Sequence, residues 1–267
     1  MADEKPNIYS DRFSGKRVLV TGGSRGIGAA IARRLGAEGA LVAICYRTRS
    51  FEAEQIAQAI VDNGGQAFTI QVDLEKSGSA QQMLEAWDET TRSLVGDNRL
   101  DALVNCAGIT SAAPLTEIFE HAYDRIMAIN TKAPLFVSAE GAKRMYQGGR
   151  IVTIGSGAAT QPGSLNGAYG MSKAALLAMT RSLAVELGPH GITANVVAPG
   201  YTKTDNTAHM LSVPDFAEKV KRVTARDRLG MPEDVAALVC WLASDDSGWV
   251  TGQWIEASGG YKMVPPI

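Results

Sequence analysis

The segment Val18-Leu-Val-Thr-Gly-Gly-Ser-Arg-Gly-Ile-Gly28 decides the fold of this 267-residue chain. A short β-prone run enters a bend with glycines at Gly22, Gly26 and Gly28, and a helical pattern follows directly. Such a bend lets the main chain approach a pyrophosphate closely, and the N–H groups and dipole of the helix start attract its charge. We therefore predict a nucleotide-binding loop; the alternative is a tight turn without a ligand. The other residues of the predicted loop are Ser24, Arg25 and Ile27.

The rest of the chain repeats this alternation of short apolar runs and longer helical patterns. Runs rich in Val, Ile and Leu predict strands at residues 17–21, 40–46, 66–72, 100–105, 149–155, 192–197 and 253–257. Helical patterns lie at residues 26–38, 51–63, 77–95, 122–146, 168–187 and 232–243. This order predicts an α/β class, single-domain Rossmann fold: a doubly wound, seven-stranded parallel sheet with helices on both faces.

The chain length suits one large core and not two full catalytic domains. We expect residues 1–13 to form a flexible N-terminal arm and residues 14–267 to form the single catalytic domain. Residues 202–228 are weakly periodic and interrupt the strand–helix alternation. Long excursions of this kind are usually functional, so we predict a substrate lid there.

Composition argues against several classes of function. A net charge of −2 gives no basic footprint for nucleic acid. No apolar run approaches the roughly 18 residues of a membrane span, and the polar N-terminus lacks the apolar stretch of a signal peptide. The three cysteines and three histidines have no metal-ligand spacing, so we expect no metal site. Scattered thiols fit a reducing compartment, and we predict a cytoplasmic protein.

The end of the second predicted strand indicates which dinucleotide binds. NAD-binding folds place an acidic residue about 20 positions after the glycines, where it binds the ribose 2′-hydroxyl. Here that position holds Arg47, with Arg49 nearby and Arg25 in the glycine loop. Because a guanidinium can bind a 2′-phosphate through two hydrogen bonds, the pattern favours NADP(H). The alternative is that these arginines are solvated surface charges.

A third pattern indicates acid–base chemistry. Tyr169 and Lys173 lie four residues apart in a predicted helix, with Ser156 thirteen residues before the tyrosine. Positions i and i+4 share one helix face, which predicts that the ammonium lies beside the phenol. A free phenol has a pKa of about 10. A neighbouring cation lowers that value, so the pair is predicted to be a general acid or base tuned toward neutral pH.

Taken together, these motifs resemble those of the short-chain dehydrogenase/reductase family, over residues from about 13 to 262. The stretches that carry the resemblance are Thr21-Gly-Gly-Ser-Arg-Gly-Ile-Gly28, Asp73-Leu74, Asn105-Cys-Ala-Gly108, Asn130, Ser156, Tyr169, Lys173, Pro199-Gly-Tyr-Thr-Lys-Thr204 and residues 249–260. One departure is Cys106, which replaces the second asparagine of the family pattern and is expected to be a buried, inert thiol.

The resemblance implies how the cofactor is held and how the subunits assemble. The implied cofactor-binding residues beyond the glycine loop are Arg47, Asp73, Leu74, Asn105, Ala107, Gly108, Tyr169, Lys173, Pro199, Gly200, Thr202 and Thr204. Members of the family usually form tetramers or dimers, so a homotetramer or homodimer is expected.

The resemblance also implies a role for each catalytic residue. Ser156 hydrogen-bonds the substrate oxygen, and Tyr169 gives that oxygen a proton as a hydride reaches the carbonyl carbon. Lys173 holds the cofactor ribose and lowers the tyrosine pKa, and Asn130 orders a water of the proton relay. The simpler alternatives are a strand-end cap for Ser156 and a polar helix-interior residue for Asn130.

The leading expectation is therefore an NADPH-dependent oxidoreductase acting on a small-molecule ketone or aldehyde. One alternative is a 3-oxoacyl-[acyl-carrier-protein] reductase. Its carrier-docking arginines appear as Gln147 and His190 here, although Lys143 and Arg144 lie one turn back. A second alternative is an alcohol dehydrogenase working in the oxidative direction. A third, from another class, is a cofactor-sensing protein that has kept the fold and lost catalysis.

Overall fold

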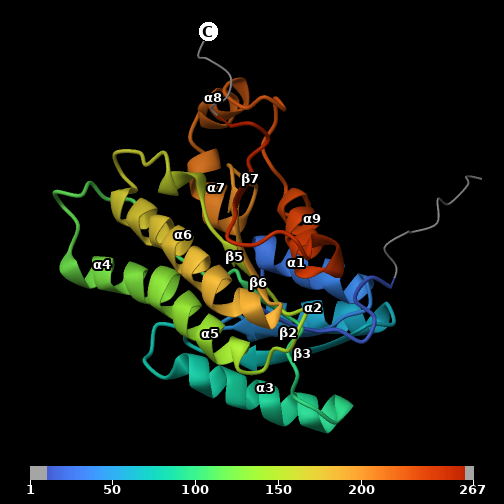
Figure 1. Ribbon diagram of the computed structural model, residues 1–267. Helices are drawn as coiled ribbons and strands as arrows, with labels where there is room; N and C mark the ends of the chain where they lie inside the picture. The colour runs from blue at the N-terminus through green and yellow to red at the C-terminus, as the bar shows by residue number, and fades with distance from the viewer. Residues whose placement is uncertain (1–10, 262–267) are drawn as a thin grey trace, which may run out of the picture.

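A computed structural model of the protein describes residues 11–261 and has one seven-stranded sheet at its centre (Figure 1). The strands are all parallel, in the order β3-β2-β1-β4-β5-β6-β7. Because the strand order reverses between β1 and β4, a crevice opens there at the carboxyl ends of the strands. The predicted doubly wound parallel sheet is confirmed. Its strands are β1 (Arg17–Thr21), β2 (Leu41–Tyr46), β3 (Gln66–Gln71), β4 (Ala102–Asn105), β5 (Arg150–Ile154), β6 (Thr193–Pro199) and β7 (Trp254–Ala257).

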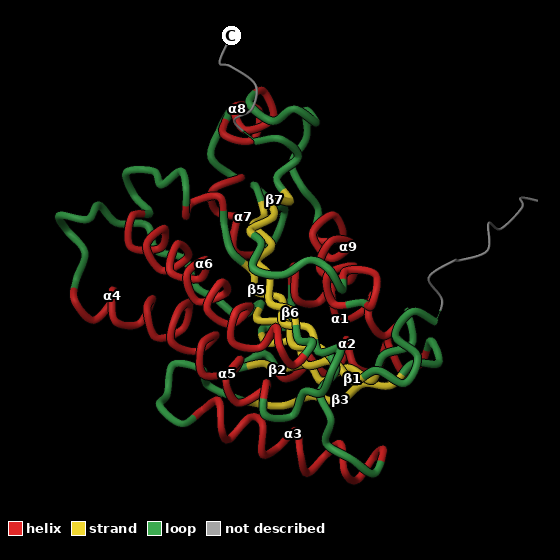
Figure 2. Tube along the Cα trace, viewed as in Figure 1, coloured by secondary structure: helices red, strands yellow, loops and turns green. Residues whose placement is uncertain are grey.

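Helices cover both faces of the sheet (Figure 2). Helices α1, α2 and α9 pack on one face, over a core that contains Val18 and Ile31. Helices α3, α5 and α6 pack on the other, over a core that contains Leu19 and Trp87. Neighbouring strand residues thus enter different cores, which explains their uninterrupted apolar sequence. The helices are α1 (Gly26–Ala37), α2 (Ser50–Asp62), α3 (Ser79–Val95), α4 (Glu120–Met127), α5 (Ala133–Ala142), α6 (Gly167–Leu187) and α9 (Pro232–Ala243).

The predicted helix over residues 122–146 differs in the structure. It begins earlier, as α4, passes through a π-helical turn (Ala128–Lys132) and continues as α5, which ends at Ala142. The turn inserts extra main chain into an otherwise continuous helix, and such insertions occur often at functional sites. Asn130 lies within it.

The predicted lid contains two short helices that its weak periodicity did not predict. They are α7 (Asp205–Leu211) and α8 (Phe216–Arg222), near the top of Figure 1. No residue of α7 is buried, and α8 buries only Val220. Helices with so little apolar surface against the core leave a weak hydrophobic pattern. Among the described helices, none is both long and apolar enough to cross a membrane.

The structure does not support a flexible N-terminal arm that extends as far as residue 13. Residues 1–10 lie outside the described part of the chain, whereas Arg12 and Phe13 are packed on the domain. The Phe13 side chain is 1% exposed, and the Arg12 guanidinium donates to the Glu38 carboxylate at 2.8 Å. The domain therefore begins before residue 13, because an aromatic side chain completes the core there.

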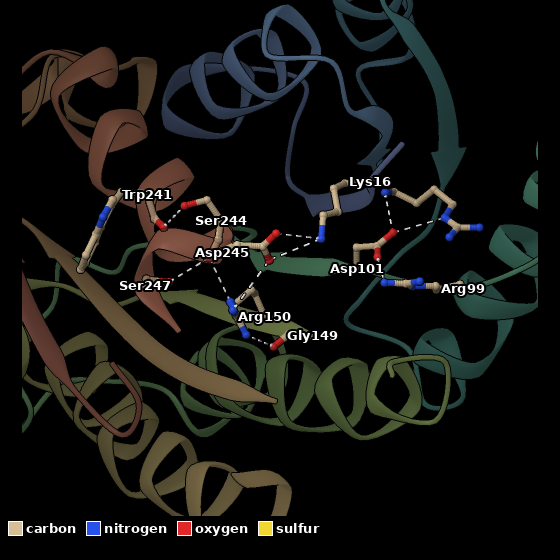
Figure 3. Close-up of polar contacts among 10 residues, drawn as sticks. Lys16, Arg99, Asp101, Gly149, Arg150, Trp241, Ser244, Asp245 and Ser247 are labelled. Carbon is tan, nitrogen blue, oxygen red and sulfur yellow. Dashed lines mark hydrogen bonds and ion pairs between the residues drawn. The ribbon is translucent and has the colours of Figure 1, made fainter. Parts of the chain in front are cut away.

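Arg150, the first residue of β5, connects the amino end of this strand to the end of α9 (Figure 3). Its buried guanidinium donates to the carbonyls of Ser244 at 3.0 Å and Gly149 at 3.1 Å. Burial lowers the pKa of Arg150, an effect that nearby Asp245 opposes. Asp245 lies between Arg150 and Lys16, 3.2 Å from the Lys16 ammonium. Because Ser244 is the C-cap of α9, Arg150 supplies a donor that the helix end needs.

We predict that Arg150→Met lowers the free energy of unfolding by about 1–3 kcal/mol, because it removes the hydrogen bonds of a buried guanidinium to the Ser244 and Gly149 carbonyls. Urea denaturation measures this loss. Lys16→Met is the matched control: it removes an exposed ion pair and should cost under about 1 kcal/mol. Equal effects of the two substitutions would contradict this account of Arg150.

Candidate active site

The crevice at the carboxyl ends of the strands holds a cavity of about 810 Å³. Almost every site residue predicted from the sequence lines it. These are Gly22, Ser24, Arg25, Gly26, Ile27, Gly28, Arg47, Asp73, Leu74, Ala107, Gly108, Ser156, Tyr169, Lys173, Pro199, Gly200, Thr202 and Thr204. The two predicted residues that are not in its lining, Asn105 and Asn130, are 3% and 0% exposed and lie behind its wall.

The glycine loop lies so close to its neighbours that side chains would collide there. A Cβ on Gly22 would be 2.8 Å from the Ala107 Cα, and one on Gly28 would be 2.3 Å from the Gly22 carbonyl oxygen. The Thr21 hydroxyl joins the two loops, because it accepts the N–H groups of Cys106 and Ala107 at 3.0 and 3.1 Å. This main-chain cradle at the start of α1 fits the pyrophosphate of a dinucleotide.

Three exposed arginines lie along the same cavity, next to the glycine loop. Each has a carboxylate partner that the sequence analysis missed. Arg25 lies 3.4 Å from Asp205, Arg47 lies 3.6 Å from Glu75, and Arg49 lies 2.9 Å from Glu52. Guanidiniums at this position fit a ribose 2′-phosphate, in agreement with the predicted preference for NADP(H).

Tyr169 lies in the first turn of α6, partly buried in the cavity wall. Burial raises the pKa of its phenol, and a hydrogen bond with Ser156 opposes that rise. The Ser156 hydroxyl also accepts the Ala158 N–H at 3.2 Å, as the N-cap of a 3₁₀ turn (Gly157–Ala159). Ser156 is therefore both the strand-end cap and the partner of the tyrosine.

The pKa of Tyr169 is raised, whereas its spacing from Lys173 predicted a lowered value. The Lys173 ammonium donates to the Ile154 carbonyl at 2.8 Å and lies 6.0 Å from the centre of the Tyr169 ring. The side chain is buried, and the loss of hydration lowers the pKa of Lys173 itself to about 8. The i, i+4 spacing did bring the two residues together, but desolvation dominates the shift at both.

Asn130 and Asn105 support the cavity from behind. The Asn130 amide donates to the Ile109 carbonyl at 2.9 Å and to the Ser172 hydroxyl at 3.0 Å, and its oxygen accepts the Ile109 N–H at 2.9 Å. The Asn105 amide donates to the Ser138 hydroxyl at 2.9 Å. The Asn130 side chain thus fixes the loop at Ile109, which lines the cavity. The Asn105 side chain instead contacts α5, behind the cavity lining in which it was predicted to bind the cofactor.

Cys106 is held in an inert form. Burial raises the pKa of its thiol to about 12, although the Lys173 charge opposes the rise. Because the thiolate is the reactive form, this cysteine is a poor nucleophile at neutral pH. Within residues 11–261, no group of three or more His, Cys, Asp or Glu side chains is placed to hold a metal ion.

Comparisons with known proteins agree with this site. A family model described as "Enoyl-(Acyl carrier protein) reductase" matches residues 22–262. Versicolorin reductase 1 of Dothistroma septosporum is 35% identical, with 95% of this chain and 98% of that protein covered. A probable tetrahydroxynaphthalene reductase of Zymoseptoria tritici is 33% identical, with 97% and 98% covered. The chain belongs to the short-chain dehydrogenase/reductase family.

A solved structure extends this result to the cofactor. The angucycline C-6 ketoreductase LanV with bound NADP is 37% identical and superimposes with a TM-score of 0.90, over 95% of this chain and 98% of that one. The family and fold expected from the sequence are confirmed. So is the choice of NADP(H), which rested on the arginine at the end of β2.

The cavity of this chain also has an aromatic wall, which the sequence analysis missed. The Tyr201 ring makes edge-on contacts with the Tyr261 and Phe216 rings, with centroids 5.3 and 5.4 Å apart. Tyr201, Tyr261, His209 and Met210 line the cavity. Tyr261 reaches it because its segment pairs with Thr224 at the end of α8. Its only sequence signal was its place just after the Gly259-Gly260 turn.

We predict that ketone reduction slows as pH rises through about 8, where Lys173 loses its charge. Tyr169 keeps its proton over this range because its pKa is raised. A pH profile of kcat measures the effect. Lys173→Arg stays charged, so any activity that it retains should lack this step. A wild-type profile that stays flat to pH 9.5 would refute the prediction.

Proposed function

We propose that this enzyme uses NADPH to reduce a ketone group on a polycyclic aromatic molecule. One observation carries the proposal: the Tyr169–Ser156 hydrogen bond and the Tyr201–Tyr261 ring pair line the same cavity. The first supplies a proton donor, and the second supplies an edge-on aromatic surface for a planar ring. The names of related enzymes support this substrate class, since versicolorin, tetrahydroxynaphthalene and angucycline reductases all act on aromatic polycycles by name.

The chain's own residues complete the reduction. NADPH, when bound, supplies a hydride to the carbonyl carbon. Ser156 donates a hydrogen bond to the carbonyl oxygen, and Tyr169 transfers its proton there, so the product is an alcohol. The raised pKa of Tyr169 keeps this proton in place at neutral pH. The buried charge of Lys173 stabilises the phenolate left behind, in surroundings where water screens little.

Two further residue groups belong to the proposal. Asn130 orders a water that returns a proton to the site, a role supported by its fixed position between Ile109 and Ser172. Residues 202–228 act as a lid over the substrate, supported by the presence of His209 and Met210 in the cavity lining.

The alternatives have less support. Carrier docking by a 3-oxoacyl-[acyl-carrier-protein] reductase needs available cations, yet Arg144 donates to Asp88 at 2.7 and 2.8 Å, and Lys143 donates to Glu140 at 2.7 Å. A sensing protein without catalysis has no need of Tyr169 and Lys173 together in the cavity. Alcohol oxidation uses the same residues in reverse, and the usually reduced NADP pool disfavours that direction.

We also propose that the enzyme is a homotetramer or homodimer. Exposed apolar residues follow one face of α6, at Met171, Ala174, Ala178 and Val185. Phe136 on α5, which runs beside α6 in Figure 1, is 52% exposed. Apolar faces of this kind usually mark contacts between proteins. A cytoplasmic location is part of the same proposal, supported by three free cysteines.

We predict that Tyr169→Phe lowers kcat for an aromatic ketone such as 2-tetralone by about 10²–10⁴-fold, because the proton donor is lost. NADPH binding, followed by fluorescence titration, should survive. The wild type should also prefer 2-tetralone to a 3-oxoacyl thioester of acyl carrier protein in kcat/KM. Near-normal turnover by the variant would refute the mechanism, and the opposite preference would favour the carrier-dependent alternative.

We predict that Phe136→Lys shifts the protein to a smaller assembly, because a buried charge would oppose contact between copies. Size-exclusion chromatography with light scattering measures the mass. Phe51→Lys is the control, since Phe51 is 67% exposed on α2, across the sheet. A wild-type monomer, or equal behaviour of the two variants, would contradict the proposal.

A further inference from the structure

Asp205, the first residue of α7, lies against two arginines that line the cofactor side of the cavity. Its Oδ2 atom is 3.4 Å from Arg25 and 3.8 Å from Arg49. Arg25 is the N-cap residue of α1 and Arg49 is that of α2. One carboxylate of the lid thus joins the starts of two helices that carry the predicted phosphate-binding cations.

The charges around these arginines are already balanced by the protein. Arg25, Arg47 and Arg49 face the carboxylates of Asp205, Glu75 and Glu52. A ribose 2′-phosphate carries about −1.5 to −2 charges at neutral pH, like other phosphate monoesters. Such a dianion must compete for guanidinium donors with the carboxylates that already hold them.

Asp205 is the carboxylate most easily displaced. Its contacts, at 3.4 and 3.8 Å, are longer than the 2.9 Å contact of Glu52 with Arg49. Glu75 lies 3.6 Å from Arg47, but a hydrogen bond from Arg125 at 3.0 Å holds it in place. Neither contact of Asp205 is that short. The Asp205 side chain is 56% exposed, so water can replace its lost contacts at little cost.

Movement at Asp205 reaches the substrate side through α7. Thr204, which precedes it, caps this helix together with Thr207. The Thr204 side chain also packs 3.4 Å from the point where a Gly26 Cβ would lie, so the start of α7 rests on the glycine loop. One turn further on, His209 and Met210 line the cavity.

We propose that Asp205 is a positioning residue that competes with the 2′-phosphate of NADP(H) for Arg25 and Arg49. Binding of this phosphate then frees the start of α7. NAD(H), which lacks the phosphate, leaves Asp205 in place. Coupling between two sites is reciprocal. The Asp205 contact therefore weakens binding of the phosphate, and the bound phosphate weakens the Asp205 contact by the same factor. The proposal rests on the proposed function only through its cofactor.

The first test compares 2′,5′-ADP with 5′-AMP, which differ by the phosphate in question. We expect Asp205→Asn to lower the Kd of 2′,5′-ADP about three-fold, the size of one exposed ion pair, and to leave that of 5′-AMP unchanged. Glu218→Gln is the matched control: it removes the same charge from the lid at α8, where Glu218 pairs with Lys221. Isothermal titration calorimetry needs no turnover for this comparison.

The second test follows the lid itself. In the wild type, 2′,5′-ADP should speed amide hydrogen exchange at residues 204–211, and 5′-AMP should not. In Asp205→Asn the exchange should be fast from the start and respond little. Unchanged or weaker binding of 2′,5′-ADP by the variant, or no response of the wild-type lid, would overturn the proposal. Equal affinity of the wild type for 2′,5′-ADP and 5′-AMP would also overturn the proposal about Asp205. NADPH-dependent ketone turnover tests the proposed function separately.

Discussion

The Thr21 hydroxyl, which accepts two N–H groups from the loop after β4, is the contact on which the site depends. It holds the glycine loop and the Cys106–Ala107 main chain close enough that only glycine fits at position 22. That proximity narrows the crevice where the strand order reverses and gives the dinucleotide cradle its shape. The same loop continues through Gly108 to Ile109, which Asn130 holds from the π-helical turn. The side chains of Thr21 and Asn130 thus hold the two ends of one loop, which lies between the glycine loop and the π-helical turn.

Burial sets the chemistry of the catalytic residues more than their mutual charges do. Tyr169 and Lys173 share a pocket in which the charged form of each is disfavoured. The phenol therefore holds its proton firmly, while the ammonium gives up its proton more easily. In the proposed mechanism, this suits a donor that stays protonated until charge develops on the substrate oxygen, when Ser156 and Lys173 stabilise the products of transfer.

The sequence alone was sufficient for the sheet and for most of the cavity lining. Strand residues such as Val18 and Leu19 enter two different cores, so they form uninterrupted apolar runs that are easy to recognise. Gly22 and Gly28 were predictable because a close approach of main chains permits no other residue. Features set by tertiary contact were not: the π-helical turn at Asn130 and helices α7 and α8. The direction of the Tyr169 pKa shift was also missed, because spacing reveals proximity but not solvation.

Tyr261 has a consequence for how the enzyme folds. The Arg226 and Ala225 N–H groups bond to the carbonyls of Gly259 and Gly260, so the aromatic wall is closed by residues that follow β7. The same cavity is also lined by the glycine loop after β1, near the other end of the described chain. Contacts between segments so far apart in sequence form late, because loop-closure entropy opposes them until the intervening structure exists. The sheet can therefore form before residues 258–261 complete the aromatic side of the cavity.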